Sequence, residues 1–154
     1  MTRKAARNGF ELSETRRTLP IALLRARETV MERFRPMLSA HGVTEQQWRV
    51  LRVLQEADEL DATDVSEAAC ILAPSISRMT RTLEAKGLVE TRKDPADGRR
   101  SLIRLTKAGD SFLRQVAPES AAIYEEIETL VGRDRIEALL DEVDALLNAL
   151  ERDG

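Results

Sequence analysis

The spacing of apolar residues along the chain changes period partway through the sequence. Apolar positions three or four residues apart predict helices over residues 19–41, 44–57, a short stretch beginning at 61 or 63, 74–86, 106–131 and 133–151. Residues 88–93 and 101–105 are instead short runs typical of strands. The pattern therefore predicts a mainly α-helical protein with a small β-hairpin.

Residues with known positional preferences mark the ends of these helices. Three threonines stand where N-caps are expected: Thr18, Thr44 and Thr106. Two prolines fall inside predicted helices. We expect Pro36 to bend the first helix or end its regular part, and Pro118 to kink the fifth.

A short helix, a tight turn, an amphipathic helix and then a hairpin follow one another in the order of a winged helix-turn-helix. The polar face of the fourth predicted helix carries Ser75, Ser77, Arg78 and Arg81. Serine and arginine side chains read base edges in the DNA major groove, where arginine pairs with guanine. The hairpin loop, residues 94–100, is polar and basic and is rich in turn formers. An arginine at such a tip suits the negative potential of a minor groove.

The net charge of −3 gives no reason to expect nucleic acid until it is divided along the chain. Residues 74–107 carry a balance of +5, whereas residues 108–154 carry −8. Charge alone fits a solvated helical surface equally well, so the decision rests on the motif. Together they favour a DNA-binding lobe joined to an acidic body.

Three stretches, ISRMTRTLEAKGLV at 76–89, DPADGRR at 94–100 and LTKAG at 105–109, resemble the MarR family (multiple antibiotic resistance regulators). The resemblance implies a homodimeric, ligand-releasable repressor of double-stranded DNA. It also implies that Arg99 enters the minor groove and that Asp97 orients it, and we include Arg100 in the DNA-binding set. Further stretches, IALLRARE at 21–28, FRP at 34–36, TEQQWR at 44–49 and ACILAPS at 69–75, resemble the subgroup that regulates homoprotocatechuate (4-hydroxyphenylacetate) degradation.

The last predicted helix offers more apolar surface than one small chain can cover. Its apolar positions are Ile136, Leu139, Leu140, Val143, Leu146, Leu147 and Leu150. We expect residues 19–41 and 106–151 to form dimerisation helices around a winged helix-turn-helix lobe at 44–105, all in one unit over 15–154, with residues 1–14 as a mobile basic arm. Packing of this helix on its own chain is the alternative. A two-fold dimer would space its reading helices about 34 Å apart and require a palindromic operator.

In the resembled family, effectors bind in a crevice lined by the first, second and fifth helices. The candidates here are Arg16, Arg17, His41, Trp48 and Arg49. A small aromatic acid, of the phenylacetate, catechol or hydroxycinnamate type, needs a cation for its carboxylate and an apolar wall for its ring. Other roles stay open: Trp48 as core packing, His41 as a helix-end cap, and the two adjacent arginines as a solvated or phosphate-facing start to the helix.

Cys70 lies between small and apolar neighbours and is expected to be a buried hydrophobe. The alternative function is a repressor of the same fold that responds to oxidation through Cys70, which needs an exposed, reactive thiolate.

Several classes are excluded by what the sequence lacks. One histidine and one cysteine leave no metal site, no cofactor motif is present, and no nucleophile and base pair suggests an enzyme. A winged helix that serves only for protein interaction would not need the serine and arginine face. The chain has no apolar run long enough for a membrane span, and its start lacks a secretory signal, so a cytoplasmic protein is expected.

Overall fold

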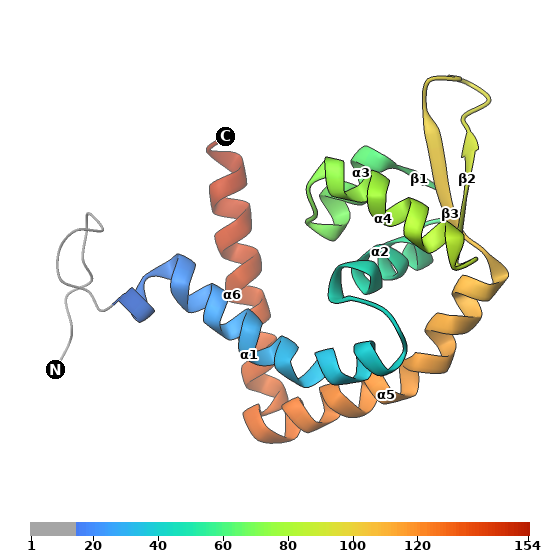
Figure 1. Ribbon diagram of the computed structural model, residues 1–154. Coiled ribbons are helices and arrows are strands. Elements are labelled where there is room, and N and C mark those ends of the chain that lie inside the picture. The colour runs from blue at the N-terminus through green and yellow to red at the C-terminus, as the bar shows by residue number, and fades with distance from the viewer. Residues whose placement is uncertain (1–14) are drawn as a thin grey trace, which may run out of the picture. The chain divides into compact units, whose positions relative to one another are not determined.

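The computed structural model describes residues 15–154; the predicted arm at 1–14 lies outside the described residues. The described chain divides into two compact units, one ending at Glu45 and the other spanning residues 46–154. The first contains a short 3-10 helix, η1 (Thr15–Arg17), and the long helix α1 (Leu19–Ala40) (Figure 1).

Helix α1 begins and ends where the sequence indicated. Thr18 is its N-cap residue in extended conformation, and the backbone N–H of His41 donates to the carbonyls of Met37 and Leu38, at 3.2 and 3.1 Å. The helix does not end at Pro36 but continues to Ala40.

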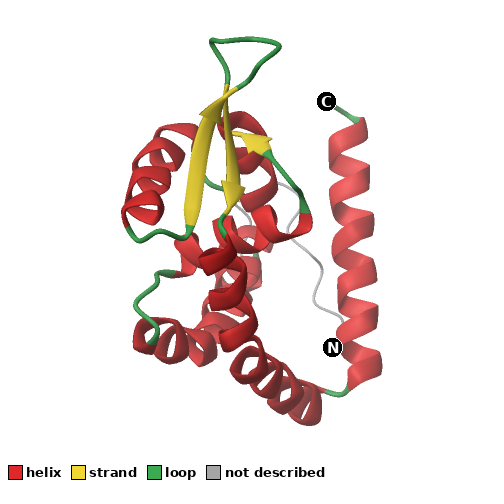
Figure 2. Ribbon diagram, turned by 90° about the vertical axis from the view of Figure 1, so that its right-hand side faces the viewer, coloured by secondary structure: helices red, strands yellow, loops and turns green. Residues whose placement is uncertain are grey.

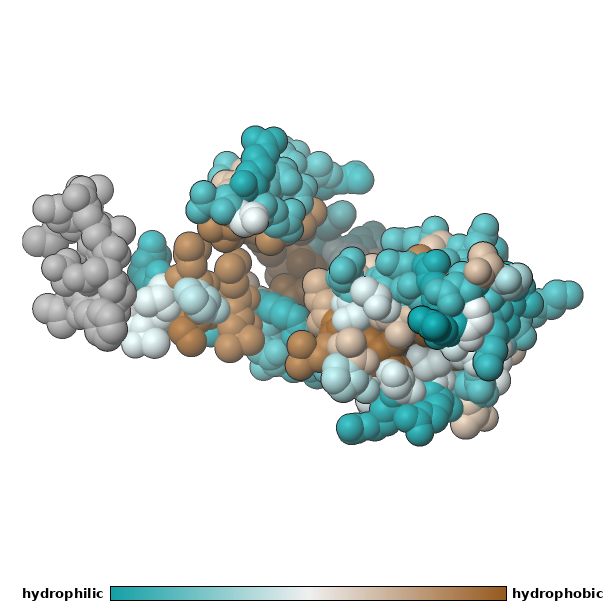
Figure 3. Space-filling model, turned by 90° about the horizontal axis from the view of Figure 1, so that it is seen from above, coloured by the Kyte–Doolittle hydropathy of each residue, from teal (hydrophilic) through white to brown (hydrophobic). Residues whose placement is uncertain are grey.

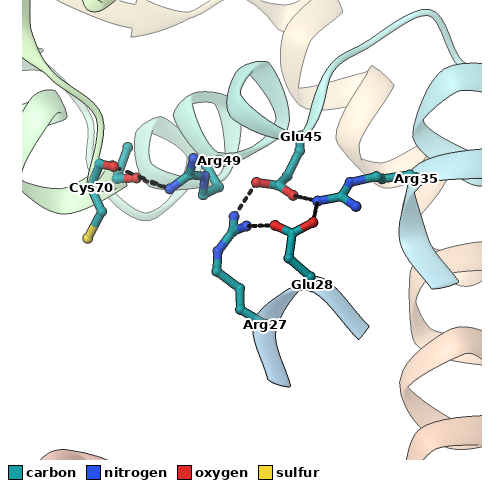
Figure 4. A network of polar contacts seen from close by, with 7 residues as sticks. Arg27, Glu28, Arg35, Glu45, Arg49 and Cys70 are labelled. Atoms are coloured by element: carbon teal, nitrogen blue, oxygen red, sulfur yellow. Dashed lines mark hydrogen bonds and ion pairs between the residues drawn. The ribbon is translucent and has the colours of Figure 1, made fainter. Parts of the chain in front are cut away.

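An ion-pair network joins α1 to Glu45, the first residue of α2 (Glu45–Glu56). Arg27 and Arg35 each contact both Glu28 and Glu45 (Figure 4). The Arg35 to Glu28 hydrogen bond, at 2.8 Å, is the main cause of the raised pKa of Arg35. The network holds Glu45, the last residue of the first unit, against α1.

The second unit contains the expected winged helix-turn-helix. After α2 come β1 (Leu60–Asp61), α3 (Ala62–Ala69), α4 (Ala73–Ala85), β2 (Val89–Lys93), β3 (Ser101–Leu105), α5 (Lys107–Val131) and α6 (Arg133–Arg152). The strands form an antiparallel sheet in the order β1-β3-β2, and the β2–β3 hairpin projects beyond the helices (Figure 2). Helix α5 runs through Pro118 without interruption.

The hydrophobic core of this unit joins one face of α2, α3, α4 and α5 to the sheet. It includes Val50, Leu51 and Leu54 of α2, Val65 of α3, Ile76 and Leu83 of α4, Val89, Ile103, and Leu113 of α5. These positions follow the apolar spacing of the sequence. The mainly helical fold with a hairpin wing is therefore confirmed.

A tight joint connects the wing to α5. Thr106 caps the helix by accepting the N–H of Gly109 at 3.0 Å, and its hydroxyl donates to the carbonyl of Gly87 at 2.6 Å. Gly109 is buried, and a Cβ placed on it would lie 2.1 Å from the carbonyl oxygen of Leu88. Only glycine permits this approach, which fixes the direction in which α5 leaves the hairpin.

Apolar side chains remain open on three helices. No residue of α6 is buried, and its Leu139 and Leu150 are 59% and 66% exposed. Leu23 and Leu24 of α1 and Leu130 of α5 are also exposed. Figure 3 shows brown patches of apolar residues on the surface. Among residues 15–154, no helix is both long enough and apolar enough to cross a membrane.

We expect Gly109→Ala to lower the free energy of unfolding by about 1–3 kcal/mol, because the added methyl group overpacks against backbone that cannot move aside. Urea denaturation followed by circular dichroism measures the change. Gly98→Ala is the matched control, since a Cβ there meets no atom within 4 Å. Equal midpoints for Gly109→Ala and wild type would contradict the tight joint.

Candidate nucleic-acid interface

The turn between α3 and α4 is held by hydrogen bonds from both sides. The N–H of Ile71 donates to the carbonyl of Ser66 at 3.1 Å, and the Ser66 hydroxyl donates to the carbonyl of Ile71. Arg49 of α2 donates to the carbonyls of Ala69 and Cys70, at 2.8 and 3.4 Å (Figure 4). The guanidinium group therefore supplies hydrogen bonds to carbonyls at the C-terminal end of α3 and fixes the turn.

Cys70 is exposed, so the expectation that it is a buried hydrophobe is wrong. It is the C-cap residue of α3 in the left-handed conformation, with φ 54°. This conformation turns its side chain away from the core, and Ile71 is buried instead.

Helix α4 has one buried face and one open face. It begins at Ala73, slightly before the predicted start, with Leu72 as N-cap residue. Ile76, Thr80 and Leu83 are buried, and Met79 packs partly against the core. The open face carries Ser77, Arg78 and Arg81, whereas Ser75 is half-buried in the first turn.

The serine and arginine side chains on the open face of α4 have no partners within the described residues. Within residues 15–154, the side chains of Ser77, Arg78 and Arg81 form no hydrogen bond or ion pair. Two cations and a hydroxyl group therefore project together from one helix that is anchored on its other side. Helices that read a DNA major groove present hydroxyl and guanidinium groups of this kind.

Two aspartates order the wing tip. The Asp94 carboxylate accepts the N–H of Ala96 at 2.9 Å, and the Asp97 carboxylate accepts the backbone N–H of Arg99 at 3.0 Å. The Asp97 carbonyl also accepts the N–H of Arg100 at 3.0 Å. Asp97 thus holds the backbone that carries Arg99.

Two wing arginines, Arg92 and Arg104, are paired with carboxylates along the hairpin. Arg92 binds Glu59 through two hydrogen bonds of 2.6 and 2.7 Å. Arg104 binds Glu90, its cross-strand neighbour, at 2.6 Å. These pairs lie along the hairpin, and they brace it without adding free positive charge.

Arg99 and Arg100 are adjacent in sequence but have different surroundings. Arg100 binds Asp61 at 2.6 Å and lies 3.5 Å from both Asp64 and Asp94. The Arg99 guanidinium forms no such contact in the part of the chain that the structure describes. Its charge is free for an external partner, whereas that of Arg100 is balanced within the chain.

Asp61 serves two partners at once. It caps α3 by accepting the N–H of Asp64 at 2.8 Å, and it pairs with Arg100 of the wing. The hydrogen bond from the Asp64 N–H, assisted by Arg100, lowers the pKa of Asp61 below its usual value of 3.8. One carboxylate thereby links the helix-turn-helix to the wing.

The proposed ligand residues fall in different places. Arg16 and Arg17 are exposed in η1, and His41 is the C-cap residue of α1. Arg49 is engaged at the end of α3, as described above. Trp48 packs partly against the core, with its ring edge-on to Phe112 at 6.4 Å, and it also lines a cavity.

This cavity, of about 330 Å³, lies between α2 and α5. Its lining is mixed aromatic, cationic and apolar: Trp48, Arg52, Gln55, Leu113, Arg114, Ala117, Ser120, Ala121 and Tyr124. Sequence reasoning missed Arg52 and Tyr124. Arg52 follows Trp48 by one helical turn, a spacing that places both on one face. The only tyrosine of the chain offered a weaker signal.

Lobe, wing and open helix face together define a winged helix-turn-helix protein of the transcription-regulator type. The MarR family model matches residues 41–100. The chain is 37% identical to the homoprotocatechuate degradative operon repressor of Escherichia coli over 88% of this chain and 94% of that protein. The chain belongs to the MarR family.

Solved structures agree with this assignment. NadR in complex with 4-hydroxyphenylacetate is 34% identical with a TM-score of 0.82, covering 89% of this chain and 100% of that one. The repressor CouR bound to a 23-mer DNA duplex is 28% identical with a TM-score of 0.78, covering 89% of this chain and 99% of that one.

We expect Asp61→Ala to lower the free energy of unfolding by about 1 kcal/mol, the usual effect of losing an N-cap. Asp61→Asn keeps an oxygen acceptor for the Asp64 N–H and should retain most of that stability. Urea denaturation near neutral pH measures both. Equal losses in the two variants would show that the charge, and not the cap, carries the effect.

The acid limb of the wild-type stability curve gives a second measurement. Because the pKa of Asp61 is lower in the folded chain, its contribution is present above the usual value of 3.8 and is lost as the pH falls through the folded value. Asp61→Asn should therefore lose stability less steeply than wild type below about pH 4.

Proposed function

We propose that this protein is a homodimeric repressor that binds a palindromic DNA operator and releases it when a small aromatic carboxylate binds. The observation that carries the proposal is the open face of α4 together with the uncompensated Arg99 at the wing tip. In this proposal Ser75, Ser77, Arg78 and Arg81 contact the major groove, and Arg99 enters the adjacent minor groove. The structure of CouR bound to a DNA duplex, which is similar to this chain, supports this mode of binding.

Dimerisation would explain the exposed apolar residues. Large apolar patches exposed to water are typical of surfaces that bind another protein. The apolar stripe of α6, with the exposed leucines of α1 and α5, supplies the surface for a second copy. The −8 charge of residues 108–154 would then lie in the dimer body, apart from the basic lobe.

The cavity between α2 and α5 is the proposed effector site. Its volume suits a single-ring ligand. Trp48 and Tyr124 supply aromatic walls, and Arg52 supplies a cation whose pairing with Glu56, at 3.8 Å on the surface, is weak. A carboxylate is the group that a guanidinium binds through two parallel hydrogen bonds. The homoprotocatechuate degradative operon repressor and the complex of NadR with 4-hydroxyphenylacetate support an aromatic acid as the effector. The former also supports control of an aromatic-degradation operon.

One observation favours a second candidate function. Cys70 is exposed in the turn that leads into α4, so oxidation there would alter the DNA-reading helix directly. The proposal of an oxidation-responsive repressor rests on this exposure alone.

We expect Arg99→Ala to weaken operator binding by about 1–3 kcal/mol. It should also make the slope of log K against log salt less negative by about 0.9 for each half-site, because one free cation is lost. Arg133→Ala, at the start of α6 and outside the winged helix-turn-helix, is the control, and its salt slope should equal that of wild type. Fluorescence anisotropy with an operator selected from random duplexes measures both. Equal slopes for Arg99→Ala and wild type would exclude the minor-groove role.

We expect 4-hydroxyphenylacetate, homoprotocatechuate or a hydroxycinnamate to quench the fluorescence of Trp48, the only tryptophan of the chain, and to release the operator. Arg52→Gln should weaken acid binding by about 1.5–3 kcal/mol, the range for a hydrogen bond to a charged group. Wild type should prefer the acid to its neutral amide, and Arg52→Gln should not. Arg133→Gln, outside the cavity, is the control.

Operator release by none of these acids would decide against the aromatic-acid response. If peroxide then releases the operator from wild type but not from Cys70→Ala, the oxidation-responsive alternative is favoured.

A further inference from the structure

Leu72 is an exposed apolar residue at the start of α4. It is the N-cap residue of α4, and its side chain cannot accept an N–H of the first turn. Its side chain is 80% exposed, the largest fraction among the exposed large apolar side chains of the described residues. The residue therefore lacks both the hydrogen bond of a good cap and the burial of an apolar side chain.

Other helices of the same lobe are capped in the usual way. Asp61 caps α3 and Thr106 caps α5, each through a side-chain oxygen that accepts an N–H of the first turn, at 2.8 and 3.0 Å. Serine, threonine, aspartate and asparagine at this position stabilise a helix by about 1 kcal/mol relative to apolar residues. With Leu72 at the N-cap position, α4 lacks this stabilisation.

The backbone around Leu72 is held firmly. Its carbonyl accepts the N–H of Ser75 at 3.0 Å, and the preceding Ile71 is buried and bonded to Ser66 in both directions. Arg49 fixes the end of α3 on the other side of the turn. A leucine projecting from so ordered a turn is presented in a defined direction.

The position of Leu72 indicates what covers it. It stands at the N-terminal end of the helix whose open face carries Ser77, Arg78 and Arg81, and N-terminal residues of a recognition helix contact base edges. The apolar group that the major groove offers is the C5-methyl group of thymine. Resting on the proposed DNA binding, we propose that Leu72 reads a thymine by contact with its methyl group, once in each half-site.

This contact adds a kind of specificity that the neighbouring side chains lack. The arginines and serines of α4 recognise hydrogen-bonding groups, and hydrogen bonds do not detect a methyl group. An apolar contact distinguishes thymine from cytosine and from uracil by the methyl group itself.

Replacement of thymine by uracil in the operator removes only that methyl group. Operators are selected from random duplexes by the wild-type protein, and thymines are then replaced pair by pair at symmetry-related positions. We expect one pair to weaken wild-type binding by about fourfold for each methyl group removed. Leu72→Ala should bind the unmodified operator as weakly as wild type binds the uracil operator, and it should be insensitive to that replacement.

Two further variants separate base reading from helix stability. Leu72→Met keeps an apolar contact and should keep the penalty for uracil. Leu72→Ser supplies a cap, so its unfolding midpoint should rise above that of wild type while its operator affinity falls. A residue that only supported the fold would move stability and affinity in the same direction.

The outcomes distinguish this inference from the proposed function. Tight and specific binding by wild type, with no thymine pair sensitive to uracil, overturns the role of Leu72 and leaves DNA binding intact. Equal uracil penalties in wild type and Leu72→Ala overturn it as well, because another residue then reads the methyl group. Absence of specific binding to any duplex overturns the proposed function itself.

Discussion

The close approach of Gly109 to the carbonyl of Leu88 is the contact on which the winged-helix lobe depends. It brings the first turn of α5 against the residue that leads from α4 into β2. Thr106 adds hydrogen bonds to the same short segment. The recognition helix, the wing and the long helix α5 therefore share one junction, and none of them can change direction there independently of the others.

Ion pairing, and not composition, decides which charges of the lobe are available to an external partner. Most wing arginines are matched to carboxylates of the wing or of the segment around β1, so they stiffen the hairpin and attract little external charge. The cations of α4 and Arg99 have no such neighbours among the described residues. Local net charge predicted a basic lobe, but the contacts decide which cations face outward.

The sequence predicted the helices and the hairpin because burial imposes a period on apolar residues, as in Ile76 and Leu83 of α4. It did not predict β1, since two residues carry no periodic signal. It did not predict the Glu59 and Asp61 partners of the wing arginines either, because these pairs join segments more than 30 residues apart. Composition around Cys70 indicated burial, whereas a left-handed backbone conformation turned the side chain outward. Of the cavity residues, Trp48 was identified from the sequence. Arg52 was missed although helical spacing places it on the same face of α2, and Tyr124 meets them only through the packing of α2 against α5.

The exposed apolar residues of α6 have a consequence for how the stability of the protein depends on its concentration. A single helix of this length gains little from its own hydrogen bonds and depends on packing for its order. If the stripe is covered by a second copy, folding of the terminal segment and assembly become one equilibrium, governed by mass action. Dilution would then loosen the C-terminal helix before it affects the winged-helix lobe, and the occupancy of DNA would fall more steeply than the protein concentration.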